Sequence, residues 1–287
     1  MLFSNHLVII RGGGDLATGV AYRLHKAGFP LIVLELARPL VIRRKVALAT
    51  AVLEGHVTIE DLHAQLAHSP TEALVMTHTD TIPVLIAPHL GSLELPPGPG
   101  QLVVVDARLA KRNIDTRIDQ AGLVVALGPG FTAGADCHAV IETMRGHWLG
   151  RVIWDGPALP NTGTPGIIGG KGAERVLRAP ADGIVEWRLA IGDLVKSGEV
   201  IGAVADQPVR APFDGVIRGL IAPETAVSQS LKIGDIDARA EVAACFTISD
   251  KALAIGGGVL EAILTHLNVT IVQSEPKWLK NAKNKCL

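Results

Sequence analysis

Aromatic residues are scarce in this chain, at 3% of 287 residues, although the hydrophobic share reaches 48%. A folded core must therefore rest on Ala, Val, Leu and Ile. The 3 cysteines are scattered and show no C-x-x-C spacing, which argues against a structural zinc site and fits a reducing compartment. No metal-ligand set is predicted from the sequence.

An excess of one charge is also missing, because 27 basic and 28 acidic residues give a net charge of −1. This balance predicts no nucleic-acid partner and no polybasic membrane surface. No apolar run has the length of a membrane span, and the first residues lack the pattern of a secretory signal. We therefore expect a cytoplasmic, globular protein without a membrane partner.

Residues 1–172 predict a Rossmann-like α/β domain with a parallel sheet. An apolar run at 7–10 enters the glycine-rich turn 11–19, a helical pattern follows, and a second apolar run at 31–35 ends in a carboxylate. Such a β-α-β unit is typical of nucleotide binding, where glycines let the backbone approach a phosphate. The cofactor-binding candidates in this unit are Arg11, Gly12, Gly13, Gly14, Asp15 and Glu35.

The glycine spacing is G-x-G-x-x-x-x-G, which differs from the dinucleotide-binding pattern G-x-G-x-x-G. Asp15 would repel a pyrophosphate at a helix start, so a second interpretation stays open: Asp15 caps the first helix and the glycines only form the turn. Further along, the cations of segment 38–45 are either a solvated surface or an anion site.

Other patterns in this domain predict helices at 47–53 and 57–66 and strands at 73–76, 81–86, 102–106 and 122–127. After the last strand, the turn Gly128-Pro129-Gly130 leads into an expected helix beginning near Thr132. Cys137 falls on the apolar side of that helix and is expected to be packed rather than reactive. His138, Glu142 and Arg145 share the other side, either as an ion-paired surface row or as one wall of a cleft with His147.

The stretch 122–166 therefore predicts a site in which a backbone turn holds an anion beside polar side chains. The cofactor-binding candidates there are Gly128, Gly130, Thr132, Arg145, His147, Asn161 and Thr162. Catalytic residues remain unassigned, with Glu142, Arg145 and His147 as candidates, and whether the protein is an enzyme is undecided.

Residues 173–242 contain an internal repeat, because Arg-Ala-Pro-x-Asp-Gly followed by apolar residues occurs at 178–185 and again at 210–217. Asp-Gly turns between short strands predict an all-β domain. The pattern resembles the barrel-sandwich hybrid of biotinyl and lipoyl carrier domains. The hairpin at 203–208, where carriers place their attachment lysine, has no lysine, so we expect neither biotin nor lipoate.

Residues 243–287 predict a C-terminal helical segment with a basic, frayed tail. Gly256-Gly257-Gly258 lies inside its apolar helical pattern. Such glycines indicate close backbone packing or a helix break, and a phosphate-holding loop is the less favoured interpretation.

Several motifs taken together resemble one family, the selenium-dependent molybdenum hydroxylase accessory proteins of YqeB type. They lie at residues 11–19, 128–134, 141–147, 149–151, 161–166, 232–239 and 249–261. The resemblance implies a bacterial protein that acts in maturation of a molybdenum hydroxylase, its client. It further implies handling of the molybdenum cofactor (molybdopterin) as cargo, or of its sulfur or selenium ligand.

Two functions from different classes follow. A maturation factor would bind this small anionic ligand with glycine-rich turns and cations, namely Arg11, Arg43, Arg44, Arg145 and Arg151. The alternative is an NAD(P)- or other nucleotide-dependent oxidoreductase that uses Gly12, Gly14 and Glu35. A scaffold that docks the hydroxylase is a third option, and assembly into a homo-oligomer is left open.

Overall fold

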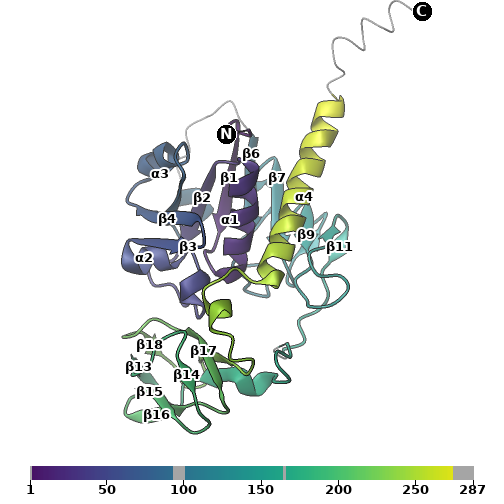
Figure 1. The fold of residues 1–287 in the computed structure, drawn as a ribbon. Coiled ribbons are helices and arrows are strands. Elements are labelled where there is room, and N and C mark those ends of the chain that lie inside the picture. The colour runs from purple at the N-terminus through teal and green to yellow at the C-terminus, as the bar shows by residue number, and fades with distance from the viewer. Residues whose placement is uncertain (1, 93–100, 164–165, 274–287) are drawn as a thin grey trace, which may run out of the picture.

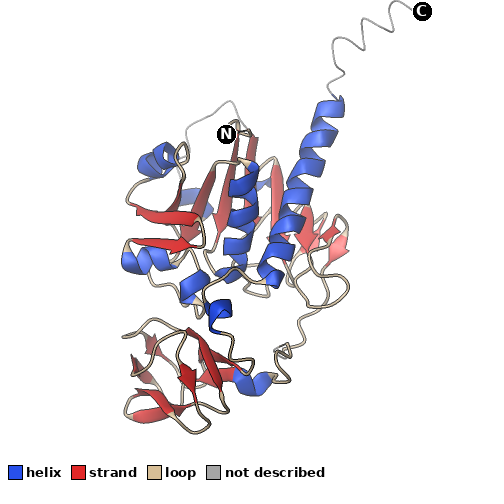
Figure 2. Cartoon of the chain, in the orientation of Figure 1, coloured by secondary structure: helices blue, strands red, loops and turns tan. Residues whose placement is uncertain are grey.

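The structure is a computed structural model in which residues 2–92, 101–163 and 166–273 are described. Its larger part is an α/β unit, and its smaller part is made of antiparallel strands (Figure 1; Figure 2). Among the described residues, the α/β unit is built on a nine-stranded sheet in the order β10-β9-β7-β6-β1-β2-β5-β4-β3. Within these ranges, no helix combines the length and apolar character that crossing a membrane requires.

The strands of the large sheet are β1 (His6–Arg11), β2 (Leu31–Glu35), β3 (His56–Ile59), β4 (Leu62–Ala67), β5 (Thr81–Ile86), β6 (Gln101–Asp106), β7 (Leu123–Leu127), β9 (Ala139–Ile141) and β10 (Val152–Ile153). The helices are α1 (Asp15–Ala27), α2 (Thr50–Glu54), α3 (Pro70–Met76) and α4 (Asp250–Gln273). Short 3-10 turns lie at Arg44–Val46, Leu90–Ser92, Ile118–Gln120, Ala173–Arg175 and Val242–Cys245.

The predicted α/β class is confirmed, but the predicted parallel sheet is wrong at both edges. β3 runs antiparallel to β4, and β10 runs antiparallel to β9. The first of these pairs replaces the helix expected at 57–66. Leu62 and Ala64 are buried while His63 and Gln65 are exposed, which is the two-residue period of a strand.

Segment 70–76 is a helix, not the expected strand. Ser69 caps it by accepting a hydrogen bond from the Glu72 N–H at 3.1 Å, and Pro70 occupies its first turn. The strands expected at 81–86, 102–106 and 122–127 are confirmed, as are the first two strands of the chain. These runs were predictable because apolar side chains cover both faces of a central parallel strand.

The helix expected after Phe131 is also wrong. The chain there forms β8 (Thr132–Ala133), which pairs with β11 (Gly156–Pro157), and then β9, which adds to the large sheet beside β7. Val140 and Ile141 are fully buried in β9. Their spacing from Cys137 imitated a helical stripe, but burial against the sheet is what selects apolar residues here.

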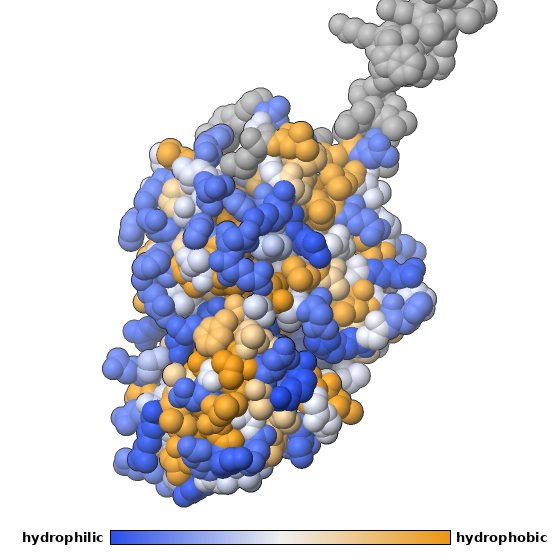
Figure 3. Space-filling model, viewed as in Figure 1, coloured by the Kyte–Doolittle hydropathy of each residue, from blue (hydrophilic) through white to orange (hydrophobic). Residues whose placement is uncertain are grey.

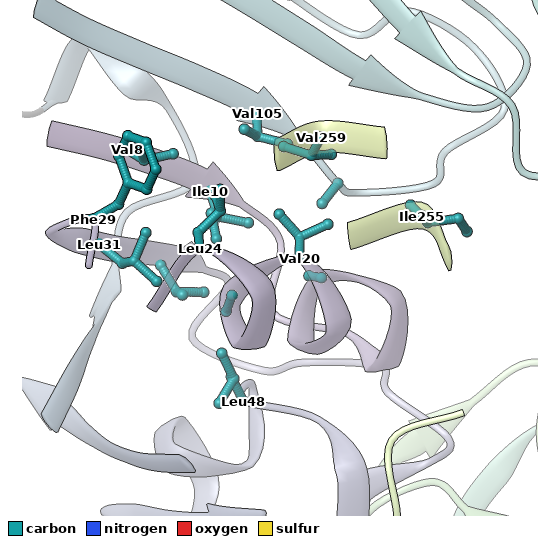
Figure 4. Packing of buried hydrophobic residues seen from close by; sticks show 14 of the residues in the cluster. Val8, Ile10, Val20, Leu24, Phe29, Leu31, Leu48, Val105, Ile255 and Val259 are labelled. Atoms are coloured by element: carbon teal, nitrogen blue, oxygen red, sulfur yellow. The ribbon is translucent and has the colours of Figure 1, made fainter. Parts of the chain in front are cut away.

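One face of the large sheet packs on α1 and α4 (Figure 4). α1 ends where Gly28 adopts a left-handed conformation and its N–H bonds the carbonyls of Leu24 and His25. Val20 and Leu24 of α1 and Ile255 and Val259 of α4 meet the sheet in one aliphatic core. The segment expected as a separate C-terminal helix therefore lies on the α/β unit. Its tail, 274–287, lies outside the described residues.

Close backbone packing explains Gly256 and Gly258 of α4, one of the two interpretations that the sequence left open. A Cβ atom on Gly256 would lie 2.2 Å from the Gly19 carbonyl oxygen of α1, and one on Gly19 would lie 2.3 Å from the Ala252 oxygen of α4. A Cβ on Gly258 would lie 2.1 Å from the Gly150 oxygen. Helix α4 continues through all three glycines without a break.

The smaller part consists of two four-stranded sheets, ordered β12-β19-β17-β14 and β16-β15-β13-β18 among the described residues. The strands are β12 (Val176–Arg178), β13 (Gly183–Trp187), β14 (Leu194–Val195), β15 (Val200–Val204), β16 (Gln207–Arg210), β17 (Gly215–Leu220), β18 (Ala226–Val227) and β19 (Lys232–Asp237). Every pairing in these sheets is antiparallel. The glycine of each repeat copy is the first residue of a strand, Gly183 in β13 and Gly215 in β17.

Segment 38–45 joins the two parts. Arg44 Nε donates to the Leu220 carbonyl at 2.8 Å, and Arg43 Nη2 donates to the Ala244 carbonyl at 3.0 Å. Ile42 packs so closely that a Cβ on Gly219 would lie 2.8 Å from its carbonyl oxygen. Two cations expected at an anion site or in solvent therefore serve in part as interdomain contacts.

Candidate functional site

A cleft of about 660 Å³ lies between the α/β unit and the smaller part. Among the described residues, eight cationic and three acidic side chains line it. The α/β unit and α4 contribute Arg43, Lys111, Arg145 and Lys251, and the smaller part contributes Arg175, Arg178, Arg218 and Lys232. Figure 3 shows one face of the molecule, on which hydrophilic and hydrophobic side chains both lie along the boundary between the two parts.

Four of these cations have carboxylate partners. Arg43 contacts Asp15 at 3.2 Å, and Arg145 binds both oxygens of Asp250 at 2.7 and 3.0 Å. Arg218 pairs with Asp237 at 3.0 Å, and Arg175 pairs with Asp235; in the Arg218 pair both side chains are almost fully buried. These pairs fix the guanidinium groups in place, so the walls of the cleft are ordered before any ligand arrives.

Lys232 and Lys251 differ from the paired cations. Within the described part of the chain, neither ammonium group makes a hydrogen bond or salt bridge, although both side chains are partly buried. Burial lowers the pKa of Lys232, opposed by Asp235. Burial also lowers the pKa of Lys251, and Arg145 lowers it further. A bound anion would supply the missing counter-charge to both groups.

Arg218 adds a second sign of an incomplete site, a buried hydrogen-bond donor without a partner in the described residues. Its side chain is 6% exposed, and burial followed by the nearby Arg43 lowers its pKa. The Nε atoms of Arg218 and Arg43 are both buried without a hydrogen-bond partner in the described residues. Such orphaned donors are rare in folded proteins, and they indicate a position where protein groups alone do not complete the electrostatics.

Two long helices begin at this cleft. Gly14, Asp15 and Leu16 at the start of α1 line it, and so do Ser249 and Lys251 at the start of α4. The N-terminal ends of helices carry partial positive charge and unbonded N–H groups. Their position therefore adds to the attraction that the side-chain cations exert on an anion.

Glu142 shapes one wall of the cleft and is only 1% exposed. Its Oε1 accepts the Met144 N–H at 2.7 Å, and its Oε2 accepts the Leu159 N–H at 2.8 Å. Both carboxylate oxygens thus hold backbone on two different loops. This arrangement places Glu142 at the cleft as expected, in a positioning role.

Arg145 and His147 are separated by the structure. Arg145 lines the cleft, whereas His147 does not; it is exposed and packs edge-on against Trp148, with ring centroids 4.8 Å apart. Arg151 lies over the same Trp148 ring at 4.4 Å. Asn161 and Thr162 do line the cleft. Of the sequence candidates in this stretch, Glu142, Arg145, Asn161 and Thr162 are therefore brought together.

The turn Gly128-Pro129-Gly130 does not form the expected anion-holding backbone. No helix follows it, and the Gly128 N–H already bonds the Ile141 carbonyl at 2.9 Å. A Cβ on Gly128 would lie 2.4 Å from Thr143 Oγ1, and one on Gly130 would lie 2.5 Å from the Arg112 nitrogen. These glycines permit tight packing.

Two further residues of this stretch are also held by the protein itself. The Thr132 N–H donates to Asp136 at 2.8 Å, within the loop that carries β8. Cys137 is fully buried, and burial, with Asp136 beside it, raises the pKa of its thiol to about 12. The expectation that Cys137 is packed and not reactive is confirmed.

The glycine-rich turn after β1 is also largely enclosed by protein. A Cβ on Gly12 would lie 3.1 Å from Arg108 Cα, and one on Gly13 would lie 2.8 Å from the Ala49 nitrogen. Glu35 accepts the Gly13 N–H and the Leu36 N–H, each at 2.7 Å, so both oxygens of this carboxylate are engaged. Gly14 differs, because no heavy atom lies within 4 Å of its added Cβ.

Arg11 belongs to a buried polar network at the ends of β1 and β6. It is 2% exposed, and it donates to Asp115 at 2.6 Å and to Thr116 at 3.1 Å. Arg108 donates to Asp106 and Asp115, and Thr116 donates to Asp106. Arg11 was expected to face a ligand phosphate, but its charge is already balanced within the protein.

Asp115 gives this network a pH dependence. Burial raises its pKa, but hydrogen bonds from Arg108 and Arg11 outweigh that effect and lower the pKa from 3.8 to about 2. The folded-state pKa is below the unfolded one, so the stabilisation is present above about pH 4 and is lost as the pH falls towards 2. We expect the difference in urea midpoint between the wild type and Asp115→Asn to shrink from pH 6 to pH 3. A difference that stays constant over this range would contradict the assignment.

Five of the eight cleft cations were not singled out in the sequence, namely Arg175, Arg178, Arg218, Lys232 and Lys251. Arg43 and Arg145 were named as ligand-binding cations, and Lys111 follows the strand predicted at 102–106, at an edge where parallel sheets bind ligands. Lys232 and Lys251 did stand inside the motifs that carried the family resemblance, at 232–239 and 249–261. Each is a single lysine in a strand or at a helix start. Nothing in its local pattern distinguishes it from a surface lysine.

The fold and cleft define an α/β protein with an additional antiparallel part and a cationic interdomain site. The chain is 53% identical over 261 residues to the uncharacterized protein YqeB of Escherichia coli. That alignment covers 91% of this chain and 48% of YqeB, so the chain spans about half the length of this relative. No family model matches the sequence.

Similar solved structures include an aspartoacylase family protein from Mesorhizobium loti, at 11% identity, covering 81% of this chain and 84% of that one with a TM-score of 0.24. A succinylglutamate desuccinylase/aspartoacylase from Rhodobacter sphaeroides is 13% identical, with 81% and 85% covered and a TM-score of 0.25. In place of the biotinyl/lipoyl-like barrel-sandwich expected for residues 173–242, the structure has two four-stranded antiparallel sheets, which with the large mixed sheet make a mixed α/β protein.

Proposed function

We propose that this protein binds a small, multiply charged anion in the cationic cleft and acts as an accessory factor in maturation of a molybdenum hydroxylase. The observation that carries the anion site is the pair of partly buried lysines, Lys232 and Lys251, which line the cleft without a hydrogen bond or salt bridge among the described residues. Partial burial makes their charges costlier than in water, and a bound anion would offset that cost.

The molybdenum cofactor fits this site by its chemistry. It is a pterin that carries phosphate and oxo groups, and guanidinium and ammonium groups are the side chains that bind such oxygens. The cations come from both parts of the chain, so a bound ligand would be enclosed between them. Its role in the reaction is that of cargo, and the protein's own residues would orient it and neutralise its charge.

An NAD(P)-dependent oxidoreductase is the competing function, and the glycine-rich turn supports it less. Gly12 and Gly13 are covered by Arg108 and Ala49, and Glu35 is engaged by backbone N–H groups. A ribose hydroxyl would have to compete with those contacts. A saturable thermal shift with NAD(P)H, together with none for phosphate-bearing pterins, would favour the oxidoreductase and contradict the proposal.

The anion site is tested with inorganic pyrophosphate as the probe. We expect Lys232→Met and Lys251→Met each to weaken pyrophosphate binding at least about tenfold in calorimetry, because each removes one desolvated charge and keeps the apolar stem. Lys196→Met is the matched control, since Lys196 is 82% exposed and pairs with Asp214 on the surface. Equal affinity in wild type and both cleft variants would overturn the site.

The cellular role is tested separately with the same variants. Expressed with a molybdenum hydroxylase in cells that lack the endogenous factor, the double variant Lys232→Met/Lys251→Met should leave the hydroxylase inactive, and Lys196→Met should activate it. Mass spectrometry and molybdenum analysis of the purified wild type should find the cofactor bound. Full activation by the double variant would contradict the maturation role.

A further inference from the structure

A second cavity of about 540 Å³ lies at the carboxyl ends of the central strands. Leu34 and Glu35 end β2, Ala87 follows β5 and Ala107 follows β6, and all four line it. This edge of an α/β sheet is where ligands of such folds bind. Most of the other lining side chains are aliphatic, which contrasts with the cationic cleft.

Three of those aliphatic side chains are exposed in the described structure. Leu36 is 48% exposed, Leu40 is 53% exposed and Ile114 is 54% exposed. Large aliphatic groups gathered around a cavity gain free energy when an apolar ligand covers them. They mark this cavity as a site for an apolar or aromatic group.

The charged groups of the second cavity are already satisfied. Arg11 and Arg108 share Asp115, Arg108 also binds Asp106, and Glu35 holds two backbone N–H groups. No comparable excess of cations remains for a second phosphate. The two cavities therefore suit different parts of a ligand, an uncharged ring in one and anionic groups in the other.

The two cavities share one wall. Gly14, Asp15, Leu16, Val41 and Leu109 line both of them. Gly14, the residue before α1, belongs to this wall, and no heavy atom lies within 4 Å of the position of its missing Cβ. A ligand can therefore cross the start of α1 close to the backbone, with one end on each side.

We propose that the two cavities form one composite site for a phosphorylated planar heterocycle. The ring binds among Leu36, Leu40 and Ile114, and the phosphate groups bind at Lys232 and Lys251. This inference rests on the proposed anion site and adds the place where the ring of the ligand binds. Pterin phosphates and nucleotides share this chemistry, and they are distinguished by the test.

The test compares pyrophosphate, ADP and a dihydropterin pyrophosphate by calorimetry on the full chain. We expect at least one of the two heterocyclic ligands to bind about tenfold or more tightly than pyrophosphate, because the ring covers exposed aliphatic surface. The heterocyclic ligand with the larger gain in affinity over pyrophosphate shows whether the site prefers a nucleotide or a pterin phosphate. Equal affinities for all three probes would overturn the composite site and leave the anion site standing, whereas absence of pyrophosphate binding would overturn both.

The variant Leu40→Gln tests whether the ring of the ligand binds in the second cavity. This variant should remove the gain of the heterocyclic ligand and leave pyrophosphate affinity unchanged, since it adds no charge. Leu194→Gln is the matched control, because Leu194 is 62% exposed in β14 of the smaller part and lines neither cavity. A heterocycle gain that survives Leu40→Gln would place the ring elsewhere and contradict the proposal.

Discussion

Replacing Gly256 with alanine is expected to lower the free energy of unfolding by about 3 kcal/mol, because α1 and α4 cannot accommodate the added methyl group. The new Cβ would lie 2.2 Å from the Gly19 carbonyl oxygen, which is backbone and cannot rotate away. The helices would have to separate, and the aliphatic core around Val20 and Ile255 would lose contacts. Urea denaturation followed by circular dichroism measures the effect.

Gly257→Ala is the matched control in the same helix. No heavy atom lies within 4 Å of a Cβ at Gly257, so the substitution adds only helix propensity. We expect it to be neutral or to stabilise the protein by up to about 1 kcal/mol. Equal losses for both variants would mean that the glycines act through helix propensity or flexibility and not through contact between the helices.

Asp106→Ala is expected to destabilise the protein by about 3–5 kcal/mol, since it removes the most buried acid of the network around Arg11. Asp106 is 1% exposed, accepts a bidentate contact from Arg108 and accepts the Thr116 hydroxyl. Without it, two largely buried guanidinium groups depend on Asp115 alone. Asp106→Asn should lose less, because its amide oxygen can still accept from Thr116.

The control for this network is Asp119→Ala. Asp119 is 69% exposed and pairs with Arg117, which is 71% exposed, so the pair is surrounded by water. Such pairs contribute about 0–1 kcal/mol, and we expect a change of that size. A loss at Asp106 no larger than the loss at Asp119 would show that the buried charges are not coupled as the structure indicates. Thermal and urea unfolding at pH 7 give both values.

Local sequence predicted the central strands well and the segments at the edges poorly. β1, β2, β6 and β7 are apolar on both faces, so their composition alone excludes most other structures. In segment 57–66, Ile59, Leu62 and Leu66 recur at a helical spacing, and Leu62, Ala64 and Leu66 fit an alternating one. The choice between them depends on β5, against which β4 pairs, and that pairing is not local information.

The candidate site was likewise predicted in part from the sequence. Glu142, Arg145, Asn161 and Thr162 were found because they cluster in sequence, and they do line the cleft. Arg11 was assigned to a ligand because a cation beside a glycine-rich turn suits phosphate, and its burial with Asp115 became visible only in the structure. His147 was expected to share a cleft with Arg145 beside a helix that does not form.

The sequence by itself determined the aliphatic core and the α/β class. Each of these depends on residue type and local spacing, which the order of amino acids states directly. The mixed sheet and the cationic cleft were decided by the tertiary structure. The charges of the cleft come from segments as distant in sequence as those of Arg43 and Lys251. Only folding brings α4 onto α1 and places the starts of both helices against the smaller part. The charge density in the cleft depends on the distances between such segments. The pattern of residues within one segment gives no information about those distances.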